Sequence, residues 1–163
     1  MRFKLAMAWV AVQVLFFAGW AATEQRRLSS GSSILVRTAP VDPRDLLRGQ
    51  YLNLSYEFSR PQPFIDTGAS PEPGQDVWAV LTPAGDFHVP RGMFSRRPEG
   101  LGPREVAILG RADRWRVFYG IEEYFVPEGS ETPAQSDTTV RLRIGKDGAP
   151  RIEAVLVRGT LWP

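Results

Sequence analysis

The sequence contains no cysteine, a single histidine and only two lysines. Without cysteine the chain can form neither a disulfide nor a thiolate metal site, and cysteine usage does not reveal the redox compartment. His88 is the one imidazole available for a Ser-His-Asp site or for zinc. A Ser-Lys hydrolase would need Lys4 or Lys146 as its buried base, and we expect Lys146 in an exposed turn. These scarcities disfavour three common enzyme classes.

A strong net charge is also lacking. Lys plus Arg total 20 and Asp plus Glu total 18, which gives a formal net charge of +2. Proteins that bind nucleic acid usually carry a strongly basic domain, so we expect no nucleic-acid partner. The basic residues are nearly all arginine, which suits phosphate or carboxylate recognition but also follows from a GC-rich genome. No pattern in the chain calls for a cofactor, and we predict none.

One long apolar run is present, from Leu5 to Ala22, with Gln13 as its only clearly polar member. A helix of this length is about 27 Å long, close to the hydrocarbon thickness of a bilayer. We predict an uncleaved anchor within residues 1–27, with the rest of the chain outside an inner (cytoplasmic) membrane, facing the periplasm or the extracellular side. Basic residues flank both ends of the run, so the positive-inside rule nearly ties, and the short N-terminal tail and signal-like layout favour this orientation. A cleaved signal peptide ending near residues 19–21 is the alternative.

The rest of the chain has the pattern of β-structure. Residues 28–33 form a Ser/Gly linker, and residues 34–163 are predicted to form one all-β domain, an antiparallel sandwich or open barrel of about seven to nine short strands. One short helical turn is expected over Pro43–Arg48. The predicted strands cover residues 34–38, 51–58, 76–82, 87–89, 105–109, 114–119, 140–144 and 152–157.

Alternation within the strand predicted at 114–119 assigns its side chains to two faces. It places Trp115 and Tyr119 in the core, with Arg114 and Arg116 outside. The outward arginines could meet lipid head groups, an acidic loop of a partner, or solvent.

The densest local pattern begins at Asp42. Asp42 is a good helix N-cap, and Pro43 suits the first helical position. Asp45 favours the positive end of the helix dipole, and Gly49 can end the helix in the left-handed conformation. The chain then changes period. From Tyr51 the apolar residues alternate, and those on the inward face are Leu52, Leu54, Tyr56 and Phe58.

Two interpretations of this segment stay open. In the first, a short helix feeds a strand and Tyr56 packs in the core. In the second, the helix–strand corner is a binding site built from Asp42, Arg44, Asp45 and Tyr51.

The segment Gly49–Tyr56 resembles the signature of the GDYxxLxY family, with Gln50 where the family has Asp. An amide cannot replace Asp as an acid, a base or a metal ligand, although it can still form hydrogen bonds. The segment Tyr119–Gly129 resembles the family's second characteristic segment, a tyrosine-glycine pair followed by an acidic and aromatic run. The positions that the resemblance marks for binding or structure are Asp42, Arg44, Asp45, Gly49, Gln50, Tyr51, Leu54, Tyr56, Tyr119, Gly120, Glu122 and Tyr124.

The resemblance implies a single-span membrane protein with a polytopic membrane protein as its partner. We therefore expect a non-catalytic accessory or binding subunit, held in the membrane by residues 5–22. The alternative is an envelope hydrolase or metal-binding protein whose acidic cluster holds Ca²⁺ or acts on a glycan. That cluster would consist of Asp42, Asp45, Glu122 and Glu123. An enzyme needs these carboxylates unengaged in a cleft, whereas a binding module needs an exposed aromatic or apolar patch.

Overall fold

The computed structural model describes residues 2–29, 31–39, 47–48, 51–127 and 133–162. The chain forms two compact units, Met1–Gly31 and Ser32–Pro163. The first unit is the helix α1 (Arg2–Ser29), in which apolar residues occur on all sides. Among the described residues, no helix is both long and apolar enough to cross a membrane. The run at Leu5–Ala22 is therefore helical as expected, while its predicted span is not supported.

The second unit is mostly β-structure, as predicted. Its described residues form eleven strands in three sheets, and every strand pairing is antiparallel. The strands outnumber the seven to nine expected, because the sheets include strands of only two or three residues that the sequence pattern did not show. Two further segments, Glu57–Ser59 and Gln135–Asp137, are short 3₁₀ helices named η2 and η3.

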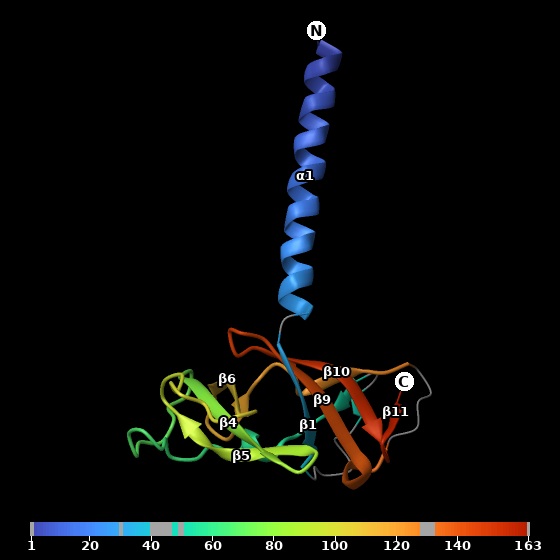
Figure 1. The fold of residues 1–163 in the computed structure, drawn as a ribbon. Coiled ribbons are helices and arrows are strands. Elements are labelled where there is room, and N and C mark those ends of the chain that lie inside the picture. The colour runs from blue at the N-terminus through green and yellow to red at the C-terminus, as the bar shows by residue number, and fades with distance from the viewer. Residues whose placement is uncertain (1, 30, 40–46, 49–50, 128–132, 163) are drawn as a thin grey trace. The chain divides into compact units, whose positions relative to one another are not determined.

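Two four-stranded sheets make up most of this unit. The first has the order β1 (Ser32–Arg37), β9 (Thr138–Ile144), β10 (Pro150–Val157), β11 (Thr160–Trp162). The second has the order β5 (Phe87–Phe94), β4 (Asp76–Ala84), β6 (Val106–Ala112), β7 (Val117–Phe118). Figure 1 shows these sheets side by side, and β1 approaches β5.

The third sheet is small and joins distant parts of the chain. Its order is β2 (Leu47–Arg48), β3 (Tyr51–Asn53), β8 (Glu123–Phe125). The side chains predicted to share the inward face of 51–58 are all buried. The strand itself ends at Asn53, and the chain then continues through an isolated bridge at Tyr56 into η2.

Several local expectations were wrong. Leu47 and Arg48 belong to a strand, not to the predicted helical turn, whose other residues lie outside those described. The strand at Phe87 continues past Pro90 to Phe94; it is an edge strand, which tolerates a residue without an N–H.

Trp115 does not lie in the core. Its side chain is 80% exposed, because the backbone N–H of Asp113 donates to the Arg116 carbonyl at 2.7 Å and closes a turn there. The strand predicted from Arg114 begins only at Val117, so its alternation does not reach the tryptophan.

Candidate functional site

The two segments that resemble a family signature lie side by side in the β unit. Strands β3 and β8 pair with Tyr51 opposite Phe125 and Leu52 opposite Tyr124. Beyond the end of β3, the N–H of Leu54 donates to the Glu122 carbonyl at 2.7 Å. Backbone hydrogen bonds therefore hold the two segments together although the chain between them is long.

Two buried tyrosines tie these segments from both directions. The Tyr56 hydroxyl donates to the carbonyl of Ile121, and the Tyr119 hydroxyl donates to the carbonyl of Phe58, each at 2.8 Å. The Phe58 ring stacks on Tyr56 at 4.9 Å and meets Tyr119 edge-on at 5.1 Å between ring centroids. Burial, and secondarily the charge of Glu122, raises the pKa of both tyrosine hydroxyls. Both hydroxyls are therefore neutral donors at physiological pH.

A glycine makes room for one of these rings. A Cβ at Gly110 would lie 2.5 Å from the nearest Tyr119 ring atom. The ring of Tyr119 therefore lies directly against the backbone of β6, which fixes the second segment on the sheet.

Glu122 closes the turn that follows Tyr119. Its carboxylate accepts the N–H of Tyr119 at 2.6 Å and the N–H of Gly120 at 2.9 Å. Gly120 has a φ of +77°, a conformation that strongly favours glycine. Both oxygens of Glu122 are thus engaged by backbone donors of their own turn, and its chemistry is that of a structural cap.

The outward side of β3 and β8 carries an exposed aromatic pair. Tyr51 is 46% exposed and Phe125 is 58% exposed, and their rings meet edge-on at 5.7 Å. Tyr124 is half-buried on the opposite face, where its ring lies 6.5 Å from that of Trp162. The exposed pair Tyr51/Phe125 is called the motif surface below.

The structure brings the described motif residues into one place. The side chains or backbone groups gathered along the β3–β8 pairing belong to Tyr51, Leu54, Tyr56, Tyr119, Gly120, Glu122 and Tyr124. The remaining predicted positions lie outside the described residues, and these are Asp42, Arg44, Asp45, Gly49 and Gln50.

The acidic cluster remains a prediction. Glu122 is engaged by its turn, Glu123 is exposed on β8, and the aspartates of the cluster lie outside the described residues. Within the described ranges, no group of three or more His, Asp or Glu side chains is arranged to hold a metal ion.

Sequence reasoning missed three contributors to this site. Phe125 was not singled out, although alternation along Glu123–Phe125 would have placed it opposite Tyr124. No local sequence pattern points to Gly110 or to the carbonyl of Ile121, because their roles arise from tertiary contacts.

Comparison with known proteins finds a family match that covers both segments. A family model described as GDYXXLXY protein matches residues 13–155, which include both segments and most of the chain. No curated protein and no solved structure matches the chain significantly.

Proposed function

This chain belongs to the GDYXXLXY family, and on that premise we propose that it is a non-catalytic accessory subunit of a membrane protein complex. In this proposal α1 anchors the chain in the inner (cytoplasmic) membrane. The β unit faces the periplasm or the extracellular side, and the motif surface binds an extramembrane loop of a polytopic membrane protein.

The observation that carries the proposal is the exposure of the motif surface. A signature tyrosine, Tyr51, points outward beside Phe125, although the other tyrosine of that signature, Tyr56, is buried. Aromatic side chains are enriched at the centres of protein interfaces because they bury large area at small entropic cost. An outward Tyr51 adds little to the core, so a partner that covers it gives this position a role.

The state of Glu122 favours binding over hydrolysis. A general acid or base must be free to exchange a proton with substrate. Two backbone N–H groups occupy the Glu122 carboxylate instead, and protonation would remove an acceptor that the turn requires. The proposal therefore assigns no catalytic role to Glu122.

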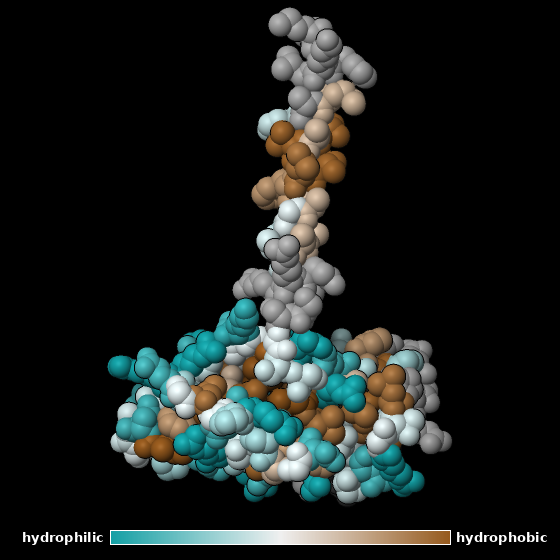
Figure 2. Space-filling view, viewed as in Figure 1, coloured by the Kyte–Doolittle hydropathy of each residue, from teal (hydrophilic) through white to brown (hydrophobic). Residues whose placement is uncertain are grey.

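The side chains of α1 support the proposed anchor. Figure 2 shows apolar residues gathered along the middle of the helix. Trp9, Leu15 and Phe16 are 66%, 72% and 68% exposed. Exposed apolar area of this kind is unfavourable in water and is stabilised in hydrocarbon. The apolar run also begins at Leu5, ahead of the first described side chain of the helix, Met7.

The test is partner capture from native membranes. The full-length tagged protein is crosslinked, purified and analysed by mass spectrometry, in parallel with the double variant Tyr51→Ser/Phe125→Ser. We expect a stoichiometric polytopic protein with the wild type and its loss with the double variant. The matched control is Trp115→Ser, which removes an aromatic side chain that is 80% exposed elsewhere and should leave capture unchanged.

Two outcomes would contradict the proposal. Recovery of the wild-type protein without a stoichiometric partner would reject the accessory role. Extraction of the protein by alkaline carbonate, with a mature N-terminus near Ala22, would reject the anchor and favour a cleaved signal peptide.

A further inference from the structure

A cavity of about 200 Å³ opens between β1, β5 and η2, apart from the motif surface. Its apolar wall includes Val36, Phe58, Phe87 and Pro90. Pockets that bind small molecules typically combine such a wall with a few placed polar groups. Three ionisable side chains, Arg37, Glu57 and His88, also line this one.

Arg37 and Glu57 bring opposite charges to the cavity without neutralising each other. The Arg37 guanidinium lies 4.4 Å from the centroid of the Phe87 ring, which fixes it by a cation–π contact. Among the described residues, neither side chain has an ion-pair partner. The guanidinium therefore keeps its donors for an anion, and the Glu57 carboxylate keeps its acceptors for a cation.

His88 contributes a buried atom that lacks a partner. Its ring nitrogen Nε2 donates to the carbonyl of Arg104 at 3.0 Å, since a carbonyl can only accept. In the neutral ring Nδ1 is then an acceptor. This atom is buried and has no hydrogen-bond partner in the described part of the chain. An unsatisfied buried acceptor is costly. The ring of His88 is therefore a polar part of the cavity wall whose hydrogen bonding the described fold leaves incomplete.

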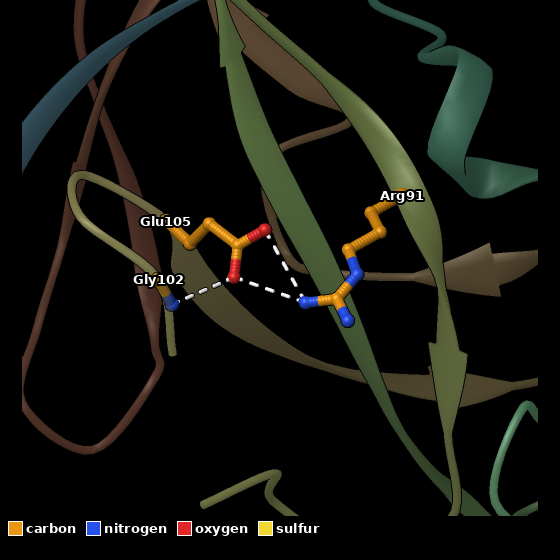
Figure 3. A network of polar contacts seen from close by, with 3 residues as sticks. All are labelled: Arg91, Gly102 and Glu105. Carbon is orange, nitrogen blue, oxygen red and sulfur yellow. Dashed lines mark hydrogen bonds and ion pairs between the residues drawn. The ribbon is translucent and has the colours of Figure 1, made fainter. Parts of the chain in front are cut away.

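The loop that carries the Arg104 carbonyl is itself held in place. Figure 3 shows the Glu105 carboxylate between the Gly102 N–H and the Arg91 guanidinium. The N–H of Gly102 donates to it at 2.8 Å, and Nη1 of Arg91 donates at 3.0 Å. These contacts fix the neighbouring carbonyl that orients His88. The imidazole is therefore preorganised, which lowers the entropic cost of binding.

One wall of the cavity belongs to the core that unites the two motif segments. Phe58 lines the cavity, stacks on Tyr56 and accepts the Tyr119 hydroxyl through its carbonyl. A ligand in the cavity would therefore contact a residue that packs against the two tyrosines beneath the motif surface.

From these observations we propose that the cavity binds a small zwitterion with an apolar body, of the class of free apolar amino acids. The ligand carboxylate pairs with Arg37, and its ammonium pairs with Glu57. The apolar body lies against Phe58 and Val36. This site is separate from the proposed partner surface and adds ligand binding to the function proposed above.

The first test separates the two charges of the ligand. Binding of L-leucine, isocaproate and isoamylamine to the full-length protein in detergent micelles is measured by titration calorimetry. We expect leucine to bind at least about tenfold more tightly than either single-charge analogue. Equal binding of isocaproate, or no heat with leucine, would overturn the proposal.

The second test uses variants of the exposed rim. Arg37→Gln and Glu57→Gln should each weaken leucine binding about tenfold or more. Ala84→Phe, which fills the cavity from its rim, should abolish binding. Arg114→Gln, which changes an exposed arginine that does not line the cavity, is the control and should leave affinity unchanged. Unchanged affinity for leucine in Arg37→Gln would reject the site. Partner capture is measured with the same variant, so a failure of the leucine site can be told apart from a failure of the proposed accessory role.

Discussion

The hydroxyl groups of Tyr56 and Tyr119 are buried donors whose acceptors are backbone carbonyls of the opposite motif segment. Each hydrogen bond therefore joins two parts of the chain that local structure does not connect. Removing a hydroxyl leaves a carbonyl without its donor in a dry environment, which costs more than the loss of the bond alone. These two residues thus explain why a family signature contains tyrosine at positions that never reach solvent.

We predict that Tyr56→Phe and Tyr119→Phe each lower the free energy of unfolding by about 1–3 kcal/mol. Tyr51→Phe should change it by less than about 0.5 kcal/mol, because the Tyr51 side chain is exposed. Urea denaturation of the full-length protein in micelles, followed by circular dichroism, measures all three. A Tyr51→Phe effect as large as the other two would contradict the structural assignment.

Alternation along the sequence identified Tyr56 as buried and failed for Trp115. The reason is that alternation assigns a face only while the backbone stays extended. Residues 51–58 keep their inward face even though the strand ends early, whereas the chain at Trp115 has already turned. The capping role of Glu122 was equally hidden, since its acceptors serve backbone groups that have no sequence signature.

At the scale of elements, the hairpin of β9 and β10 depends on its turn. Gly148 has a φ of +85°, and a Cβ at this position would lie 2.4 Å from the Trp78 ring. The turn therefore packs directly on β4, where the N–H of Leu109 in the adjacent β6 also donates to the Gly148 carbonyl at 2.9 Å. Both the backbone conformation and the space require glycine.

We predict that Gly148→Ala destabilises the protein by about 2–4 kcal/mol, the sum of left-handed strain and overpacking. Gly85→Ala is the matched control, because Gly85 has a φ of +65° but nothing near its Cβ position. It should cost only the strain, about 1–2 kcal/mol. The difference between the losses of unfolding free energy in the two variants isolates the contact with Trp78. Equal losses would show that this contact does not contribute to the destabilisation.

The connection between β5 and β6 should respond to acid. The Gly102 N–H, followed by Arg91, holds the pKa of Glu105 below its ordinary value of 4.5. A carboxyl with a lowered folded-state pKa contributes stability above its unfolded pKa, and that contribution is lost as pH falls through the lowered value. The loss therefore lies on the acid side of pH 4.5.

We predict that Glu105→Gln lowers stability at neutral pH and flattens the decline below pH 4.5. Melting temperatures measured from neutral to strongly acidic buffer test this slope. Glu99→Gln, at an exposed position in the same connection, should keep the wild-type slope. If the melting temperature of Glu105→Gln falls with acid as steeply as that of the wild type, Glu105 does not cause the acid sensitivity.

Elements with strong local signals were predicted well, and elements made by distant pairing were not. The turn at residues 145–148 and the alternation on both sides of it located β9 and β10. Strands β3 and β8 are each three residues long and gain their partners only in the folded chain. No local pattern specifies that pairing, so the convergence of the two motif segments could be raised from the sequence only as a possibility.

At the scale of the molecule, the buried hydrophobic cluster is drawn entirely from residues between Ile34 and Val155. Among the side chains that the structure describes, none of its members comes from the unit Met1–Gly31. A domain whose core is complete without a neighbouring segment is expected to fold without it. The N-terminal helix would then contribute to location and leave the stability of the β unit unchanged.

We predict that a chain beginning at Ser32 folds with the melting temperature of the full-length protein, because the deletion removes no described member of the cluster. Circular dichroism of both forms in the same detergent measures this. The full-length form should pellet with membranes after expression while the shorter form stays in the supernatant, since only the former keeps the apolar run at Leu5–Ala22. A shorter form that fails to fold would mean that the helix stabilises the β unit. A full-length form that stays in the supernatant would remove the anchor from the proposed function.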